Sequence, residues 1–201
     1  MREARASVTR RAARHAYHTA RNLPDRLLHQ RRHRAACERL LRKNRPRGIL
    51  VVCYGNVCRS PYLQAVLQRE LPDVIVASAG FVGSDRPVPE ISRAISGERG
   101  LDLSGFRSRP LAPTVVNGAD LIIVMDSDQA RQVAGRFDVD RRKIVVAGDL
   151  DPEFSASRAI LDPWNKSREV FQASFDRLDR CAHTLVKLLD AARPTIGSSQ
   201  G

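Results

Sequence analysis

A short loop in the first third of the chain carries the residues most able to do chemistry. It starts at Cys53, passes through Gly55 and ends at Arg59, with Ser60 and Pro61 directly after it. Pro61 is expected to begin a helix, whose positive end attracts an anion. The backbone N–H groups of such a loop can converge on the same anion. Gly55 permits a backbone conformation that other residues resist, and the Arg59 guanidinium adds a fixed bidentate charge. The loop therefore indicates a phosphate site.

The same loop favours Cys53 as a nucleophile. The positive surroundings stabilise the thiolate over the thiol, and the thiolate is the form that attacks phosphorus. A lone Cys at the end of a strand is more often a small buried hydrophobic residue. Its combination with Gly55, the Arg59-Ser60 pair and Pro61 favours the catalytic interpretation.

A second candidate lies far along the chain, at Asp162. Phosphoryl transfer to a thiolate requires an acid that protonates the departing oxygen. Asp162 is followed by Pro163 and Trp164; the proline holds the backbone extended, and a loop carboxylate beside an aromatic ring is accessible and partly desolvated. An isolated Asp-Pro is more often a simple turn. Asp162 is a candidate acid because the Cys53 loop accompanies it.

The pattern after Gly48 predicts the elements that position these residues. Short apolar runs, typical of strands covered on both faces, occupy residues 49–53, 74–78, 121–125 and 143–147. Helical spacing or helix-start signals cover residues 61–71, 89–100, 110–117, 128–136 and 167–192. We therefore predict an α/β fold with an open, mainly four-stranded parallel sheet, helices on both faces and a basic helical N-terminal arm. Such sheets bind ligands beyond the carboxyl ends of their strands, where Cys53 lies.

The net charge is distributed unevenly along the chain. The formal net charge is +12, and residues 1–47 account for all of it, with 15 Lys or Arg and 3 Asp or Glu. We predict a basic arm, helical or flexible, over 1–47, a globular domain over 48–193 and a flexible tail over 194–201. Within the arm, an amphipathic helix is expected to begin near Pro24. Its apolar residues would be Leu27, Leu28, Ala35, Ala36, Leu40 and Leu41.

The arm leaves several functions open. Its charge suits an anionic membrane surface or an acidic partner, and its helix could instead dock on the domain. Nucleic acid is disfavoured, because Tyr17 is the arm's single aromatic residue and no base-reading pattern is present.

The cysteine pattern indicates in which cellular compartment the protein acts. Cys37, Cys53, Cys58 and Cys181 show neither metal-ligand spacing nor a dense disulfide framework. The chain also has no run of about 18 apolar residues and no export signal. We therefore expect a cytoplasmic protein, and the His residues form no metal set.

Several motifs, in order, resemble the low-molecular-weight protein tyrosine phosphatases, and the resemblance covers about residues 48–191. It rests on Val52-Cys53-x-Gly55-Asn56-x-Cys58-Arg59-Ser60-Pro61, Ser78-Ala79-Gly80, Gly100 to Ser104, Arg107-Ser108-Arg109, residues 119–126 and Asp162-Pro163. It implies a protein-tyrosine-phosphatase that hydrolyses phosphotyrosine in proteins, or small aryl phosphates, through a cysteinyl-phosphate intermediate. It implies neither a cofactor nor a metal.

The resemblance also assigns roles. Cys53 would attack phosphorus, Arg59 and the loop amides would hold the oxygens, and Asp162 would act as acid and then as base. Ser60 would stabilise the departing thiolate, and Asn56 would hold the loop's shape. The substrate-binding residues would be Tyr54, Gly55, Asn56, Val57, Cys58, Ser60 and Trp164. Tyr54 and Trp164 would form the walls of a slot that is long enough for phenyl phosphate and too deep for phosphoserine.

Two further positions follow from the resemblance. Cys58 is similar to a second loop cysteine that, in many members, forms a protective disulfide with the nucleophile; loop packing is the alternative. Phe106 stands where many bacterial relatives carry a His that supports the loop asparagine.

Two other functions compete. Arsenate reductases of the same fold relay a disulfide through further cysteines in the middle of the chain, and no Cys lies between Cys58 and Cys181. A non-catalytic module that binds phosphate or phosphotyrosine needs no nucleophile and acid together, so Cys53 and Asp162 argue against it.

Overall fold

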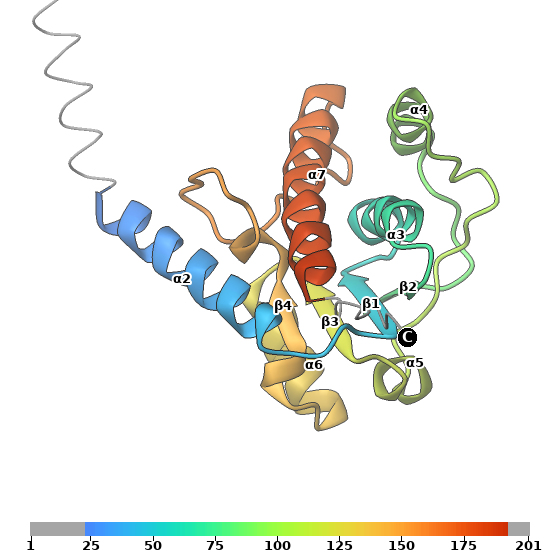
Figure 1. Cartoon of the computed structure of the whole chain (residues 1–201). Coiled ribbons are helices and arrows are strands. Elements are labelled where there is room, and N and C mark those ends of the chain that lie inside the picture. Colours follow the sequence, from blue (N-terminus) through green and yellow to red (C-terminus); the bar gives the residue numbers. More distant parts are fainter. Residues whose placement is uncertain (1–22, 193–201) are drawn as a thin grey trace, which may run out of the picture.

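A computed structural model describes residues 23–192 (Figure 1). In this part of the chain four parallel strands form one sheet in the order β2-β1-β3-β4. They are β1 (Gly48–Cys53), β2 (Ile75–Gly80), β3 (Leu121–Val124) and β4 (Ile144–Val146). The predicted α/β fold with a four-stranded parallel sheet is confirmed. Because β1 lies between β2 and β3, its carboxyl end is at the switch point where such sheets bind ligands.

Helices cover both faces of the sheet (Figure 1). On one face lie α3 (Arg59–Glu70) and α7 (Arg168–Ala191), and on the other α5 (Pro113–Asn117) and α6 (Ser127–Phe137). The alternation of side chains along each strand divides the apolar residues between two cores. The α3 and α7 side takes Ile49, Val51, Cys53, Leu121, Ile123 and Val145, and the opposite side takes Leu50, Val52, Ile122, Val124 and Val146.

The start of α3, which directly follows the Cys53 loop, is fixed against α7. The rings of Tyr62 and Phe175 stack with centroids 3.9 Å apart. The Tyr62 hydroxyl donates to Asp179 Oδ1 at 2.6 Å, and Arg99 donates to the other carboxylate oxygen at 2.6 Å. Arg99 directly follows α4 (Glu90–Glu98). Burying one such aromatic side chain stabilises the fold by about 2 kcal/mol, so the stack holds the first turn of α3 in place.

Part of the basic arm forms α2 (Leu23–Leu41), which packs against α7 and the 3-10 helix η2 (Ala147–Asp149). Ala36 and Leu40 join the core that contains α7. His29 is buried, with its ring edge-on to Phe154 at a centroid distance of 5.9 Å. The remaining arm residues 1–22 and the predicted tail 194–201 lie outside the described residues.

The predicted apolar face of this helix was wrong in part. Leu27, Leu28 and Leu41 are about half exposed, and Ala35 is exposed as well. The docked face instead contains His29, His33, Ala36 and Leu40, which lie on one side of a helix by their spacing. His33 Nδ1 lies 2.9 Å from the carbonyl oxygen of Asp149. Histidines can occupy this face because the domain offers them a hydrogen-bonding group and an aromatic ring.

Across residues 23–192, none of the helices combines the length and the apolar character needed to cross a membrane. The remaining short helix is η1 (Arg141–Lys143), which leads into β4.

Candidate active site

Cys53 ends β1, and its sulfur receives two hydrogen bonds from the loop that follows. The backbone N–H of Asn56 donates to Sγ at 3.2 Å, and the Ser60 hydroxyl donates at 3.0 Å. Cys53 is only 2% exposed. Two donors from the loop therefore converge on one buried sulfur.

Asn56 ties the loop to three neighbouring segments. Its backbone has a φ of 50°, in the left-handed region, and its side chain is fully buried. Nδ2 donates to Ser60 Oγ at 2.9 Å and to Ser78 Oγ at 2.8 Å, and Oδ1 accepts from the N–H of Arg109 at 2.8 Å. The loop asparagine is therefore held by Ser60, Ser78 and the backbone of Arg109, without the Phe106 side chain.

Gly55 serves a different purpose from the one expected. Its φ is not positive, and Asn56 is the loop residue in the left-handed region. A Cβ atom at Gly55 would lie 2.9 Å from Arg86 Nη2. A side chain at this position would shift the Arg86 guanidinium, which crosses the loop there. The expectation of an unusual backbone at Gly55 was wrong.

The Arg59 guanidinium joins the loop to Asp162. Its Nη1 donates to the carbonyl oxygen of Ile160 at 3.0 Å, and its Nη2 is paired with Asp162 Oδ2. The Nε atom is buried and has no hydrogen-bond partner among the described residues. Asp162 Oδ1 accepts from the N–H of Trp164 at 3.2 Å. The structure thus brings together two candidates that are 103 positions apart in the sequence.

Cys53, Arg59 and Asp162 line one pocket of about 160 Å³. The exposed rings of Tyr54 and Trp164 also line it. The volume is below the range of about 300–1,000 Å³ typical of drug-sized ligand sites. It therefore suits a small group with one ring. Ser60 and Asn56 act behind this lining, through hydrogen bonds to Cys53 and to the loop.

Cys58 and Val57 lie in the same lining. Burial raises the pKa of the Cys58 thiol, and the nearby negative charges of Cys53 and Asp162 raise it further. Both effects favour the neutral thiol of Cys58 over its thiolate. All four cysteines of the chain are free in the structure, and the Cys53–Cys58 disulfide stays a prediction.

The sequence analysis missed Arg86. Its Nη2 donates to the carbonyl oxygen of Gly55 at 2.6 Å and to that of Val82 at 3.0 Å, so it links the loop to the segment after β2. Its side chain also lines the pocket. The Arg86-Pro87 pair has no distinctive spacing to Cys53, so the sequence gives no signal for this contact.

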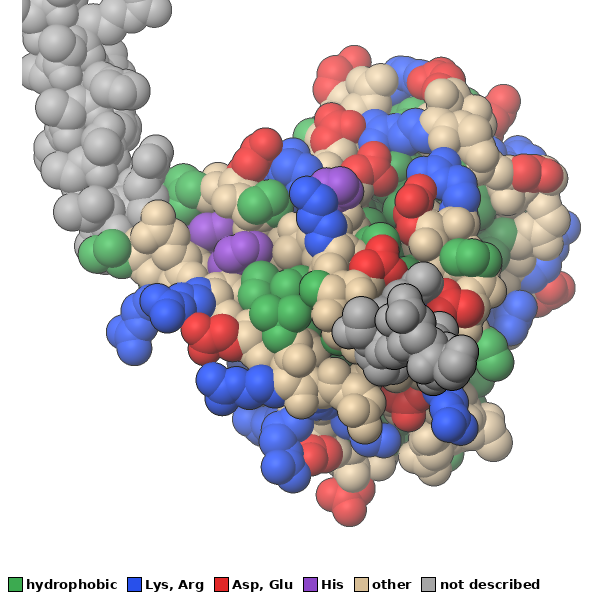
Figure 2. Space-filling view, in the orientation of Figure 1, with side chains coloured by type: hydrophobic (Ala, Val, Ile, Leu, Met, Phe, Trp, Pro, Cys, Tyr) green, Lys and Arg blue, Asp and Glu red, His purple; other side chains and the backbone are tan. Residues whose placement is uncertain are grey.

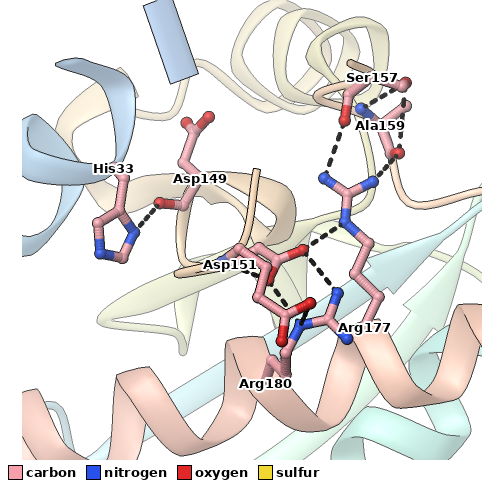
Figure 3. Close-up of polar contacts among 8 residues, drawn as sticks. His33, Asp149, Asp151, Ser157, Ala159, Arg177 and Arg180 are labelled. Atoms are coloured by element: carbon pink, nitrogen blue, oxygen red, sulfur yellow. Dashed lines mark hydrogen bonds and ion pairs between the residues drawn. The ribbon is translucent and has the colours of Figure 1, made fainter. Parts of the chain in front are cut away.

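It also missed the contacts that anchor the segment carrying Asp162. Figure 3 shows Arg177 of α7 between Asp151 and the backbone of Ser157 and Ala159. Its Nε donates to Asp151 Oδ2, its Nη1 to the Ala159 carbonyl and its Nη2 to the Ser157 carbonyl, each at 2.8 Å. Ala159 directly precedes Ile160, whose carbonyl oxygen accepts from Arg59. Arg177 therefore fixes the segment just before Asp162.

Asp151 is the buried partner in this anchor. Its side chain is fully buried, and Arg180 donates to Oδ1 at 2.9 Å and to Oδ2 at 3.1 Å. Burial acts to raise the pKa of Asp151, but hydrogen bonds from Arg180, the N–H of Glu153 and Arg177 outweigh it, and the pKa lies below its ordinary value. The sequence did contain a signal for this anchor. Two arginines lie three residues apart on the last predicted helix, and an Asp follows the fourth predicted strand.

Residues 23–192 contain no group of three or more His, Cys, Asp or Glu side chains placed to hold a metal ion.

A parallel sheet with a Cys-centred anion loop at its switch point, and a carboxylate paired to the loop arginine, defines a phosphatase-type site. The pattern of the family described as "Low molecular weight phosphotyrosine protein phosphatase" matches residues 48–195. The chain belongs to this family, and it is a protein-tyrosine-phosphatase.

Known proteins of this family resemble the chain over most of their length. It is 35% identical over 133 residues to the probable low molecular weight protein-tyrosine-phosphatase EpsP of Ralstonia nicotianae, covering 66% of this chain and 88% of the relative. The crystal structure of the tyrosine phosphatase AmsI of Erwinia amylovora superimposes with a TM-score of 0.65 at 30% identity, covering 70% and 91% of the two chains. The YwlE arginine phosphatase of Geobacillus stearothermophilus also superimposes, with a TM-score of 0.65 at 28% identity, covering 71% and 92%.

Proposed function

We propose that this enzyme acts on tyrosine-phosphorylated proteins through a cysteinyl-phosphate intermediate, with Cys53, Arg59 and Asp162 as its catalytic residues. One observation carries the proposal: a sulfur that accepts two hydrogen bonds lines the same 160 Å³ pocket as a guanidinium and a carboxylate. These are a nucleophile, an anion holder and an acid within reach of one phosphate group.

In the first step the Cys53 sulfur forms a bond to phosphorus, and the bond from phosphorus to the tyrosyl oxygen breaks. Arg59 and the N–H groups of residues 54–59 hold the three equatorial oxygens, where negative charge concentrates. The incoming phosphate takes over the guanidinium that is paired with Asp162 in the structure. Asp162, released from the guanidinium, takes up a proton from water and then gives it to the phenolate oxygen.

In the second step the Asp162 carboxylate accepts a proton from water, whose oxygen attacks phosphorus. The sulfur–phosphorus bond breaks, inorganic phosphate leaves and the thiolate of Cys53 returns. The Ser60 hydroxyl at 3.0 Å and the Asn56 N–H at 3.2 Å stabilise this leaving sulfur. The two hydrogen bonds therefore stabilise the sulfur of Cys53 both as the attacking group in the first step and as the leaving group in the second.

The anchor of the acid segment leads to a prediction for Arg177. Arg177→Lys keeps a positive charge near Asp151 but cannot donate to both the Ser157 and Ala159 carbonyls. Losing about 1–3 kcal/mol of hydrogen bonding at this anchor is expected to displace Asp162. We expect kcat for phenyl phosphate to fall about tenfold, and kcat for p-nitrophenyl phosphate, whose leaving group needs less protonation, to fall less. The two kcat values are measured side by side.

An equal loss with both substrates would show that Arg177 is purely structural. Arg168→Lys is the matched control, since Arg168, the first residue of α7, pairs with the exposed Glu98 at the end of α4.

The pocket walls favour phosphotyrosine over other phosphorylated residues. The rings of Tyr54 and Trp164 can stack on a phenyl ring, and stacked pairs contribute about 0.5–1.5 kcal/mol beyond burial. Arg86 adds a positive charge to the lining, which disfavours the guanidinium that phosphoarginine carries beside its phosphate and that phosphotyrosine lacks.

Three peptides of one sequence, carrying phosphotyrosine, phosphoserine or phosphoarginine, test this proposal. We expect kcat/KM to be at least about 100-fold higher for phosphotyrosine. Trp164→Ala should reduce that preference, and Ile75→Ala, an exposed residue of β2 outside the pocket, should not. Faster hydrolysis of the phosphoarginine peptide would contradict the tyrosine assignment.

We also propose that the enzyme acts in the cytoplasm, since its four cysteines are free thiols and its proposed nucleophile requires a reduced sulfur. The excess positive charge of the arm is proposed to contact an anionic membrane surface or an acidic partner.

A further inference from the structure

A second cleft lies between α2 and the β4 side of the sheet, away from Cys53. Its volume is about 460 Å³, and it shares no lining residue with the pocket around Cys53. The side chains of five arginines line it: Arg32, Arg39, Arg131, Arg141 and Arg158. In the space-filling view of Figure 2, Lys and Arg side chains gather along the lower side of α2.

The negative charge in the cleft is already paired with an arginine of the protein. Asp149 is the one carboxylate in the lining, and Arg158 donates to its two oxygens at 2.7 and 2.5 Å. Arg131 is paired with the exposed Asp128. Arg32 lies 3.9 Å from Asp149, beyond hydrogen-bond distance. The cleft therefore keeps an excess of positive charge.

Two arginines of α2 have donors that the protein does not satisfy. Arg32 Nε and Arg39 Nε are buried, and neither has a hydrogen-bond partner among the described residues. Leaving such a buried donor unpaired destabilises the fold. Burial lowers the pKa of Arg39, and the charge of Arg158 lowers it further while Asp149 opposes the shift. A bound anion in the cleft would lower the repulsion between the guanidiniums.

Apart from Ser127, whose hydroxyl accepts a hydrogen bond from Arg158, the rest of the lining is apolar. Ala36, Ile144 and Val146 are buried residues that border the cleft, and Ala35 and Ala130 complete this wall. Its volume lies within the range of about 300–1,000 Å³ that holds organic ligands. A lone phosphate ion would leave most of that space and the whole apolar wall unused.

We propose that this cleft binds an organic diphosphate of the size of a nucleoside diphosphate. The arginines hold the phosphate groups in bidentate fashion, and the apolar wall takes the nucleoside. Arg32 and Arg39 come from α2, which precedes the region matched by the family, residues 48–195. The cleft therefore exists because the arm of this chain is docked, and the family domain alone does not form it.

Calorimetric titration of the full chain with ADP tests the proposal, with orthophosphate present to fill the Cys53 loop. We expect one ADP per chain, weaker binding of inorganic diphosphate and no binding of adenosine. Arg39→Gln combined with Arg141→Gln should weaken ADP binding at least tenfold. Arg93→Gln combined with Arg107→Gln, the same charge change at exposed positions outside the cleft, should leave it within twofold.

Arg39 also donates to the Ile144 carbonyl at 2.9 Å, so its replacement could disturb the docking of α2. Arg141→Gln alone avoids this, because Arg141 is exposed and its side chain has no bond to lose within the described residues; it should weaken ADP binding about threefold. Absence of ADP binding to the native chain, or equal weakening in the control pair, would overturn the proposal. Diphosphate binding as tight as that of ADP would overturn the assignment of an organic ligand.

Discussion

Cys53→Ser is expected to reduce kcat for p-nitrophenyl phosphate by at least about 10³-fold. A serine hydroxyl at this position keeps the hydrogen bonds of the loop but is a far weaker nucleophile than a thiolate. The Asn56 N–H and the Ser60 hydroxyl, which donate to the sulfur, have no comparable charge to stabilise once the sulfur is gone. The rate is measured for purified variant and native chain under the same conditions.

Cys37→Ser is the matched control, because it makes the same change at a half-buried thiol of α2 outside the pocket. Its rate should stay within twofold of the native rate. Rapid acid quenching of native enzyme should also capture phosphate on Cys53. Equal rates for the native chain and Cys53→Ser would eliminate the covalent mechanism.

The fold was largely predictable because the two central strands, β1 and β3, are covered on both faces. A strand buried on both sides reads as a continuous apolar run, and residues 49–53 and 121–125 show this pattern clearly. The docked face of α2 was not predictable in the same way. Which side of this helix is buried depends on the Asp149 carbonyl and the Phe154 ring, more than 100 positions away.

The candidate site also contains residues that the sequence predicts and residues that it does not. Cys53, Arg59 and Ser60 lie within one loop and helix start, so their spacing alone predicts their convergence. Arg86 and Arg177 donate to backbone carbonyls, which any sequence supplies, so no residue type marks these acceptors. Only the Asp151 carboxylate, the third acceptor of Arg177, left a signal in the sequence. Long-range contacts of this kind become visible only when the chain is folded.

Asp162→Asn should separate the two proposed proton transfers. Loss of the acid is expected to reduce kcat for phenyl phosphate by about 10²–10⁴-fold, because the phenolate must leave without a proton. The effect on the first turnover of p-nitrophenyl phosphate should be much smaller, since p-nitrophenolate is a stable anion. Stopped-flow absorbance and steady-state rates with the two substrates give these values.

The same variant reports on the second step. An amide cannot accept the proton of the attacking water, so the cysteinyl phosphate should accumulate after a fast first step. We therefore expect Asp162→Asn to release a burst of about one p-nitrophenolate per chain, followed by slow turnover. Asp85→Asn, at an exposed carboxylate outside the pocket with a φ of 53° that asparagine also adopts, should show native rates. A variant at Asp162 without a burst, slowed equally with both substrates, would assign this carboxylate to the binding of Arg59 instead of to proton transfer.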